Sequence, residues 1–414
     1  MSNELGKGPR LEYIVSGLFQ NQGYLTRRSI PLQYGNRNQD ATDIDIIGHL
    51  FTLPFQMHTI ICDCKNKQKS KPYERIFWAK GLAQFVGASD VYVSLPQASW
   101  DTVKFAQKGN VRIITFESIK EYSKRNAYLY GLADDVFYIN FFNNLNNEIK
   151  QNKQLYDAFI ILKGIYLNED PYVTINVAID LIQTSGKNMA LIGEKGTKDN
   201  FTFWKYICCE SLIIVGLNIL KICVDTFCLP SKAREQHILS KLTYGDIDPT
   251  KINKILKYAK NVANEMVKAS IPKTALPKAS VVDFGEISPP HYAYSIVGIV
   301  ERAILNPEWY INLPQVLDFI LFEFAVKNKE FSIEIFKTIF NTGFTNEKLK
   351  AAKNLLIFAR NVCKVNIKLL WDSSDSFMTK KNEQTNEIIG TSSTNCETVN
   401  TLEQTTLDDA TKVE

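Results

Sequence analysis

The chain has 414 residues, a formal net charge of +4 and an apolar fraction of 45%, which suffices for a sizeable core. This length predicts two or three domains. Eight cysteines without a CxxC pair and only four histidines argue against a structural zinc site and against a disulfide framework. We therefore expect free thiols, which fit a reducing cytoplasm. The first residues have no apolar run of the kind that a signal region requires, so no signal region is expected.

The first 125 residues alternate between helical and extended patterns. Segment 10–23 has apolar residues at helical spacing and ends near a glycine. Extended patterns follow at 24–34, 42–50, 58–65, 90–95 and 111–116. Helical patterns separate the later ones at 73–88, 99–109 and 117–125. This alternation predicts an α/β layer with a mixed sheet flanked by helices.

The extended segment HTIICDCK carries an acid and a base two residues apart. Because side chains alternate along a strand, Asp63 and Lys65 point to one face, while Cys62 and Cys64 point to the other. The spacing by itself is typical of an edge strand with a solvated face, or of an isolated surface ion pair that stabilises little. A functional interpretation therefore depends on the neighbouring segments.

The preceding extended segment, TDIDIIGHL, adds two further carboxylates. Asp43 and Asp45 share one strand face, and either is a candidate ligand at this stage. If this strand pairs with the next, Asp45 and Asp63 converge at one end of the sheet beside Lys65, and Glu12 on the first helix can lie near the same edge. Clustered carboxylates repel unless a cation lies between them, and Mg²⁺ prefers such hard oxygen ligands.

In this order the residues resemble the PD-(D/E)xK nuclease superfamily. Within it the likeness is to Mrr-like restriction endonucleases and, more distantly, to archaeal Holliday-junction resolvases. Glu12 matches the helical glutamate, Asp45 the first acid, and Asp63 with Lys65 the (D/E)-x-K pair, while Gln84 matches a glutamine on the next helix. The resemblance spans about residues 8–122. It departs from the family where NRNQDAT stands in place of a glycine-rich approach to the first acid.

The resemblance implies a restriction-endonuclease-like domain that hydrolyses DNA phosphodiester bonds with Mg²⁺, for which Mn²⁺ can substitute. Asp45, Asp63 and the backbone carbonyl of Cys64 would bind the metal, and Glu12 would reach it through water. Lys65 would attend the attacking water, since bound Mg²⁺ acidifies water and stabilises charge on a phosphate. Gln84 would orient Lys65 or the phosphate.

Beyond residue 126 long helical patterns dominate, at 145–166, 171–185, 202–228, 250–269, 291–305, 314–340 and 346–365. Among them, the apolar run SLIIVGLNIL is shorter than the roughly 20 residues that a membrane span requires, so no membrane partner is expected. We predict a nuclease-like domain at 1–125, an all-helical domain for recognition, regulation or homo-oligomerisation at 126–371, and a disordered acidic tail at 372–414.

Charge distribution is compatible with DNA as the partner, because residues 1–125 carry 17 Lys and Arg against 11 Asp and Glu. The first functional hypothesis is an endonuclease of restriction or antiviral defence. A DNA-repair or junction nuclease uses the same chemistry. A third hypothesis is a catalytically degenerate nuclease fold that binds nucleic acid without cutting it, which the missing glycine-rich approach motivates.

Overall fold

The computed structural model of the chain describes residues 8–33, 40–65, 71–125, 135–192, 198–270, 287–327, 331–340, 344–366 and 370. Residues 1–372 form one compact unit, so the expected boundary at residue 125 is a change of secondary structure within it and not a division between two bodies. The tail expected to be disordered, 372–414, lies outside the described residues.

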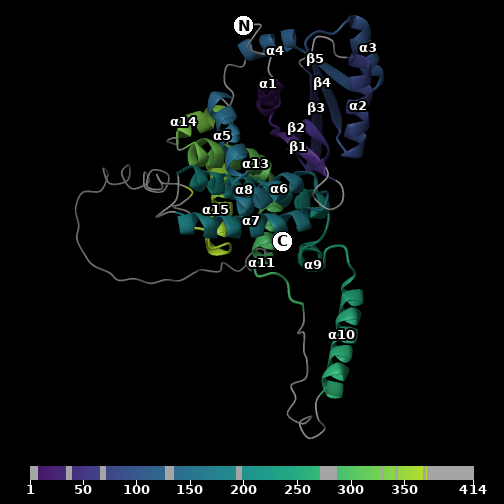
Figure 1. Cartoon of the computed structure of the whole chain (residues 1–414), viewed down its shortest axis with the longest axis vertical. Coiled ribbons are helices and arrows are strands. Elements are labelled where there is room, and N and C mark those ends of the chain that lie inside the picture. The colour runs from purple at the N-terminus through teal and green to yellow at the C-terminus, as the bar shows by residue number, and fades with distance from the viewer. Residues whose placement is uncertain are drawn as a thin grey trace, which may run out of the picture. The chain divides into compact units, whose positions relative to one another are not determined.

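Five strands form one mixed sheet in the order β1-β2-β3-β4-β5 (Figure 1). Strands β1, β2 and β3 are an antiparallel meander, while β3, β4 and β5 run parallel. The strands are β1 Leu25–Gln33, β2 Asp40–Thr52, β3 Gln56–Cys64, β4 Asp90–Leu95 and β5 Val111–Thr115. The parallel crossovers contain α2 Pro72–Phe85 and α3 Trp100–Lys108. The predicted mixed α/β layer is confirmed.

Helix α1 Gly8–Asn21 covers one face of the sheet through a shared core. Its buried stripe consists of Leu11, Val15, Leu18 and Phe19, and it packs on Ile46, Ile60, Cys62 and Cys64. Because the strand period is two, burying Ile60, Cys62 and Cys64 against α1 turns Asp63 to the opposite face of β3. The predicted alternation in β3 therefore holds.

The rest of the described chain is helical. It contains α4 Phe116–Arg125, α5 Asp135–Glu148, α6 Lys153–Gly164, α7 Pro171–Ile192, α8 Lys198–Thr226, α9 Ser231–Tyr244, α10 Pro249–Ser270, α11 Ala293–Leu305, α12 Pro307–Tyr310, α13 Leu313–Asp318, α14 Ile333–Ile339 and α15 Thr345–Asn361, with a π-helical stretch at Phe319–Val326. The predicted helix 145–166 is divided, because Asn152 caps a new helix by accepting a hydrogen bond from the Leu155 N–H. Helix α9 was not predicted.

Helix α8 is the central helix of this half. By length and composition it could cross a membrane, and its apolar stretch is much longer than the run SLIIVGLNIL suggests. However, 89% of the apolar window is buried inside the fold, which is how a core helix behaves, so the resemblance to a membrane span is weak evidence for one. By contrast, α10 buries none of its residues.

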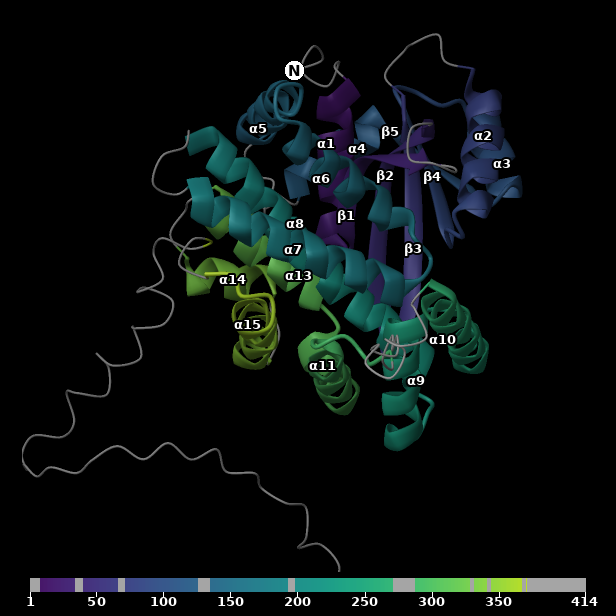
Figure 2. The same ribbon diagram turned by 60° about the horizontal axis from the view of Figure 1, so that its bottom comes forward.

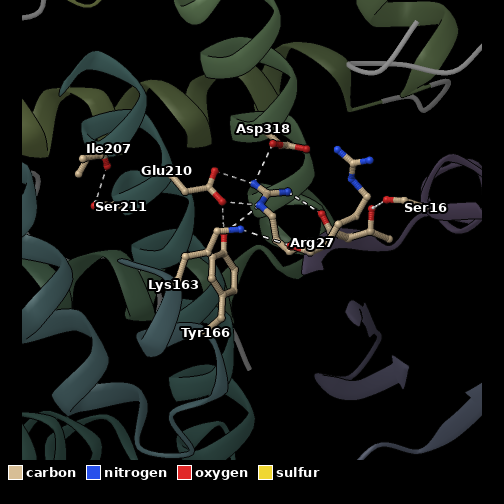
Figure 3. A network of polar contacts seen from close by, with 10 residues as sticks. Ser16, Arg27, Lys163, Tyr166, Ile207, Glu210, Ser211 and Asp318 are labelled. Atoms are coloured by element: carbon tan, nitrogen blue, oxygen red, sulfur yellow. Dashed lines mark hydrogen bonds and ion pairs between the residues drawn. The ribbon is translucent and has the colours of Figure 1, made fainter. Parts of the chain in front are cut away.

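One arginine ties the sheet to the helices (Figure 3). Arg27 of β1 makes a two-pronged contact with Glu210 of α8, and its Nη2 lies 2.9 Å from Asp318 Oδ1 of α13. Its Nε also donates to the Tyr166 hydroxyl at 2.9 Å. Burial raises the pKa of Asp318 to about 6, although the Arg27 guanidinium opposes that shift. The sheet and helices are therefore joined by a buried cluster of charges.

Candidate active site

The carboxyl end of β3 and the adjacent part of β2 bring Asp45, Asp63 and Lys65 together. Strands β2 and β3 pair with Ile46 opposite Cys62, so the same antiparallel register carries Asp45 to a place opposite Asp63. The Lys65 amine lies 3.7 Å from Asp45 Oδ2 and 3.6 Å from Asp63 Oδ1. The backbone N–H of Cys64 donates to Asp45 Oδ2 at 2.7 Å, which fixes this carboxylate against β3. We call Glu12, Asp45, Asp63 and Lys65 the carboxylate cluster.

Glu12 joins the carboxylate cluster from α1. Burial and the neighbouring Asp45 carboxylate raise the pKa of Glu12 to about 7, while Ser29, Arg28 and Lys65 act in the opposite direction. Burial also raises the pKa of Asp45, against the lowering effects of the Cys64 N–H and Lys65. Both carboxylates are therefore less stable as anions here than in water, a condition that a bound proton or cation relieves.

Ser29 shows local backbone strain beside Glu12. It lies between the paired positions Arg28–Ile46 and Ile30–Ile44, and its φ of +48° is in the left-handed region that a non-glycine residue seldom adopts. In this conformation its hydroxyl donates to Glu12 Oε2 at 3.2 Å. Such strain is found preferentially at functional sites, where the surrounding structure holds it in place.

Arg75 was not predicted as a site residue, yet its guanidinium pairs with the Asp63 carboxylate. Its Nε donates to Asp63 Oδ2 at 2.9 Å, and its Nη2 contacts Oδ1, so the guanidinium binds both oxygens of a carboxylate that is only 3% exposed. Helix α2 begins at Pro72, which places Arg75 on its first turn, beside the end of β3. No spacing rule would have found Arg75, but the need of buried Asp63 for a counter-charge points to a cation of this kind.

The structure does not bring Gln84 to the carboxylate cluster, contrary to its expected role in orienting Lys65. Gln84 is exposed near the far end of α2, nine residues or about 13 Å along the helix from Arg75. Asp43 also lies apart from the carboxylate cluster. It is exposed on β2 opposite Pro31, and its negative charge acts to raise the pKa of Lys163. Of the two candidate aspartates on β2, Asp45 is the one that contacts Lys65.

The donors suit a hard cation by type. Asp45 and Asp63 supply the carboxylate oxygens that Mg²⁺ prefers. Glu12 lies close enough to Asp45 for the Asp45 charge to raise the pKa of Glu12. Within the described ranges, no group of three or more His, Cys, Asp or Glu side chains is gathered tightly enough to hold an ion. Because Arg75 contacts both oxygens of Asp63, this carboxylate would have to exchange Arg75 for a metal. That the Cys64 carbonyl is a ligand stays a prediction.

No protein-family model, curated protein or solved structure matches the chain. The resemblance to Mrr-like nucleases therefore rests on the residues themselves.

The raised pKa of Glu12 predicts how stability depends on pH in metal-free protein. Between its ordinary value of 4.5 and about 7, the folded state binds more protons than the unfolded state, so stability falls as pH rises through this window. Glu12→Gln imitates the protonated acid and removes this part of the decline. Urea unfolding in EDTA at several pH values measures it. Parallel pH profiles for the variant and the wild type would contradict the assignment.

Proposed function

We propose that residues 8–122 form a nuclease domain of the PD-(D/E)xK type, which hydrolyses DNA phosphodiester bonds with Mg²⁺ or, as a substitute, Mn²⁺. One observation carries the proposal: the Lys65 amine lies within 4 Å of two carboxylates from neighbouring strands, Asp45 and Asp63. Further support comes from Glu12, whose charge is coupled to Asp45 from a separate helix.

In this proposal each group has a distinct role. Asp45 and Asp63 would hold the metal, with Glu12 acting through a water molecule. A bound Mg²⁺ would supply the acidity of the attacking water and the positive charge beside the phosphate. Lys65 positions that water, because its amine already lies between the two carboxylates. Arg75 would have to leave Asp63 for a metal to be held there, and its guanidinium would then be available to hold a phosphate oxygen.

The second candidate is a nuclease fold that binds nucleic acid without cutting it. Arg75 favours this alternative, because a guanidinium held on both oxygens of a buried carboxylate already supplies the counter-charge that a metal would bring. In that case Asp63 has a structural role. The carboxylate cluster would then lie at a binding surface that lacks hydrolytic chemistry.

The setting that we propose is defence against foreign DNA, with the helical half selecting the target or holding a homo-oligomer. Support for an interaction role comes from α10, a helix of 22 residues with no buried side chain. DNA repair or junction resolution uses the same site chemistry, so substrate choice must decide between these settings.

The test is incubation of the full chain with modified, unmodified and branched DNA in Mg²⁺, Mn²⁺ or EDTA. Cleavage that requires a divalent ion supports the nuclease. A preference for modified or unmodified duplex supports restriction, and a preference for branched DNA supports repair. Binding to DNA without any cleavage supports the second candidate and refutes the first.

A further inference from the structure

Helices α2 and α3 expose aromatic side chains that the sheet does not bury. Phe77 is 68% exposed and Trp100 72%, and Tyr73 and Trp78 are also exposed. Helix α2 buries only Ile76, Ala79 and Ala83, which leaves an apolar outer surface. Large apolar groups gathered on one surface mark a site of interaction.

Three of the aromatic rings are in contact across the two helices, which lie side by side (Figure 2). Phe105 of α3 contacts Tyr73 and Phe77 of α2 edge to face, with ring centroids 4.8 and 5.4 Å apart. Each of two tryptophan rings has a cation over its face. The Arg75 Cζ lies 4.6 Å from the centroid of the Trp78 ring, and the Lys104 Nζ lies 5.0 Å from the centroid of the Trp100 ring. We call Tyr73, Phe77, Trp78, Trp100 and Phe105 the aromatic platform.

The platform begins at the same edge of the sheet as the carboxylate cluster. Strands β3 and β4 are parallel, and the Lys65 N–H donates to the Ser94 carbonyl at 3.0 Å, so their carboxyl ends lie together. Helix α2 starts shortly after β3, and Trp100 starts α3 shortly after β4. Arg75 connects the two sites directly, because one guanidinium contacts both Asp63 and Trp78.

The charge around the platform suits a polyanion. Exposed lysines on and beside these helices are Lys71, Lys80, Lys104 and Lys108, against Glu74 and Asp101. Aromatic rings flanked by cations bind single-stranded nucleic acid, because bases stack on the rings while the backbone meets positive charge. In a duplex the base faces are already stacked on one another, so only unpaired bases offer a surface for these rings.

We propose that the aromatic platform stacks the unpaired bases of a single-stranded nucleic acid whose backbone continues past the carboxylate cluster. This inference deepens the proposed function, on which its link to cleavage rests, by naming the form of the substrate. The nuclease would act where bases are unpaired, as at an end, a flap or a loop. Stacking itself requires neither the metal nor hydrolysis, so binding can be measured apart from cutting.

The experiment uses the full chain in EDTA and a fluorescent oligothymidylate of about 20 nucleotides, longer than the roughly 4–16 nucleotides of common single-strand sites. Anisotropy should show tighter binding to this strand than to a duplex of equal length. Phe77→Ala and Trp100→Ala should each weaken binding about five- to a hundredfold, and Trp100→Phe should restore part of the loss. The matched control is Phe85→Ala, because Phe85 is 69% exposed at the other end of α2.

Three results would overturn the platform: tighter binding to duplex, equal losses for Phe77→Ala and Phe85→Ala, or a dimer of the chain that Phe77→Ala dissociates. The last would mean that a second copy covers the rings. A matching oligouridylate decides between DNA and RNA as the bound strand. If single strands bind as expected but no nucleic acid is cut in Mg²⁺, the nuclease proposal fails while the platform stands.

Discussion

Replacing Asp63 by asparagine, or Lys65 by methionine, is expected to slow Mg²⁺-dependent DNA cleavage by about a thousandfold or more. Loss of a metal ligand, or of the amine beside the attacking water, removes several kcal/mol of transition-state stabilisation, and each 1.36 kcal/mol is about tenfold in rate. The measurement is the single-turnover rate on the substrate that the wild type cuts best. Circular dichroism and thermal unfolding verify that each variant is folded.

The choice of asparagine follows from the buried position of Asp63. Asp63 is buried and holds the Arg75 guanidinium with both oxygens. Deleting it would leave that charge unpaired and cost about 3–5 kcal/mol. Asparagine at this position keeps the shape of the side chain and one acceptor oxygen for Arg75.

The matched control is Asp43→Asn. Asp43 lies two residues from Asp45 on the same strand, yet it is exposed and outside the carboxylate cluster. This variant should cut at the wild-type rate. If Asp63→Asn also cuts at that rate, Asp63 does not bind a catalytic metal.

Arg27→Met is expected to lower the free energy of unfolding by about 3–5 kcal/mol, because it leaves Glu210 and Asp318 buried without their counter-charge. Methionine keeps much of the length and apolar contact of the side chain, so the loss reports on the charge. At the few degrees per kcal/mol that a large domain shows, the midpoint of thermal unfolding should fall by on the order of 10 °C. Differential scanning fluorimetry in EDTA measures this shift.

Arg112→Met is the control for this prediction. Arg112 also pairs with an aspartate, lying 3.0 Å from Asp90, but its side chain is 60% exposed. Such exposed pairs contribute only about 0–1 kcal/mol. A triple variant that adds Glu210→Gln and Asp318→Asn to Arg27→Met should recover part of the stability. Equal midpoints for Arg27→Met and Arg112→Met would show that the buried cluster does not hold the sheet to the helices.

The sequence predicted those features that depend on rigid local periods. A strand turns alternate side chains to opposite faces, so the period alone assigns Ile60, Cys62 and Cys64 to one face and Asp63 to the other. Asp45 could be placed near Asp63 only if β2 and β3 pair, and they do. The order of strands and helices up to residue 125 follows from the same alternation of periods.

Features that depend on contacts between residues far apart in the chain could not be predicted from the sequence. In the sequence, Arg27 is one of two consecutive arginines and shows no sign of being buried. Its partners Glu210 and Asp318 lie 183 and 291 residues away along the chain. Arg75 has no fixed spacing from Asp63, because it lies on another element, the first turn of α2. Gln84 matched the family by residue type, but the length of α2 carries it away from Lys65.

Binding of Mn²⁺ to the metal-free full chain, followed by electron paramagnetic resonance, tests most directly whether the carboxylate cluster is a metal site. The proposal predicts that the wild type binds Mn²⁺, that Asp45→Asn loses this binding, and that Asp43→Asn retains it. The contradicting result is a wild type that binds no more Mn²⁺ than Asp45→Asn. Arg75 would then be the permanent counter-charge of Asp63, and the cluster would belong to a protein that binds nucleic acid without cutting it.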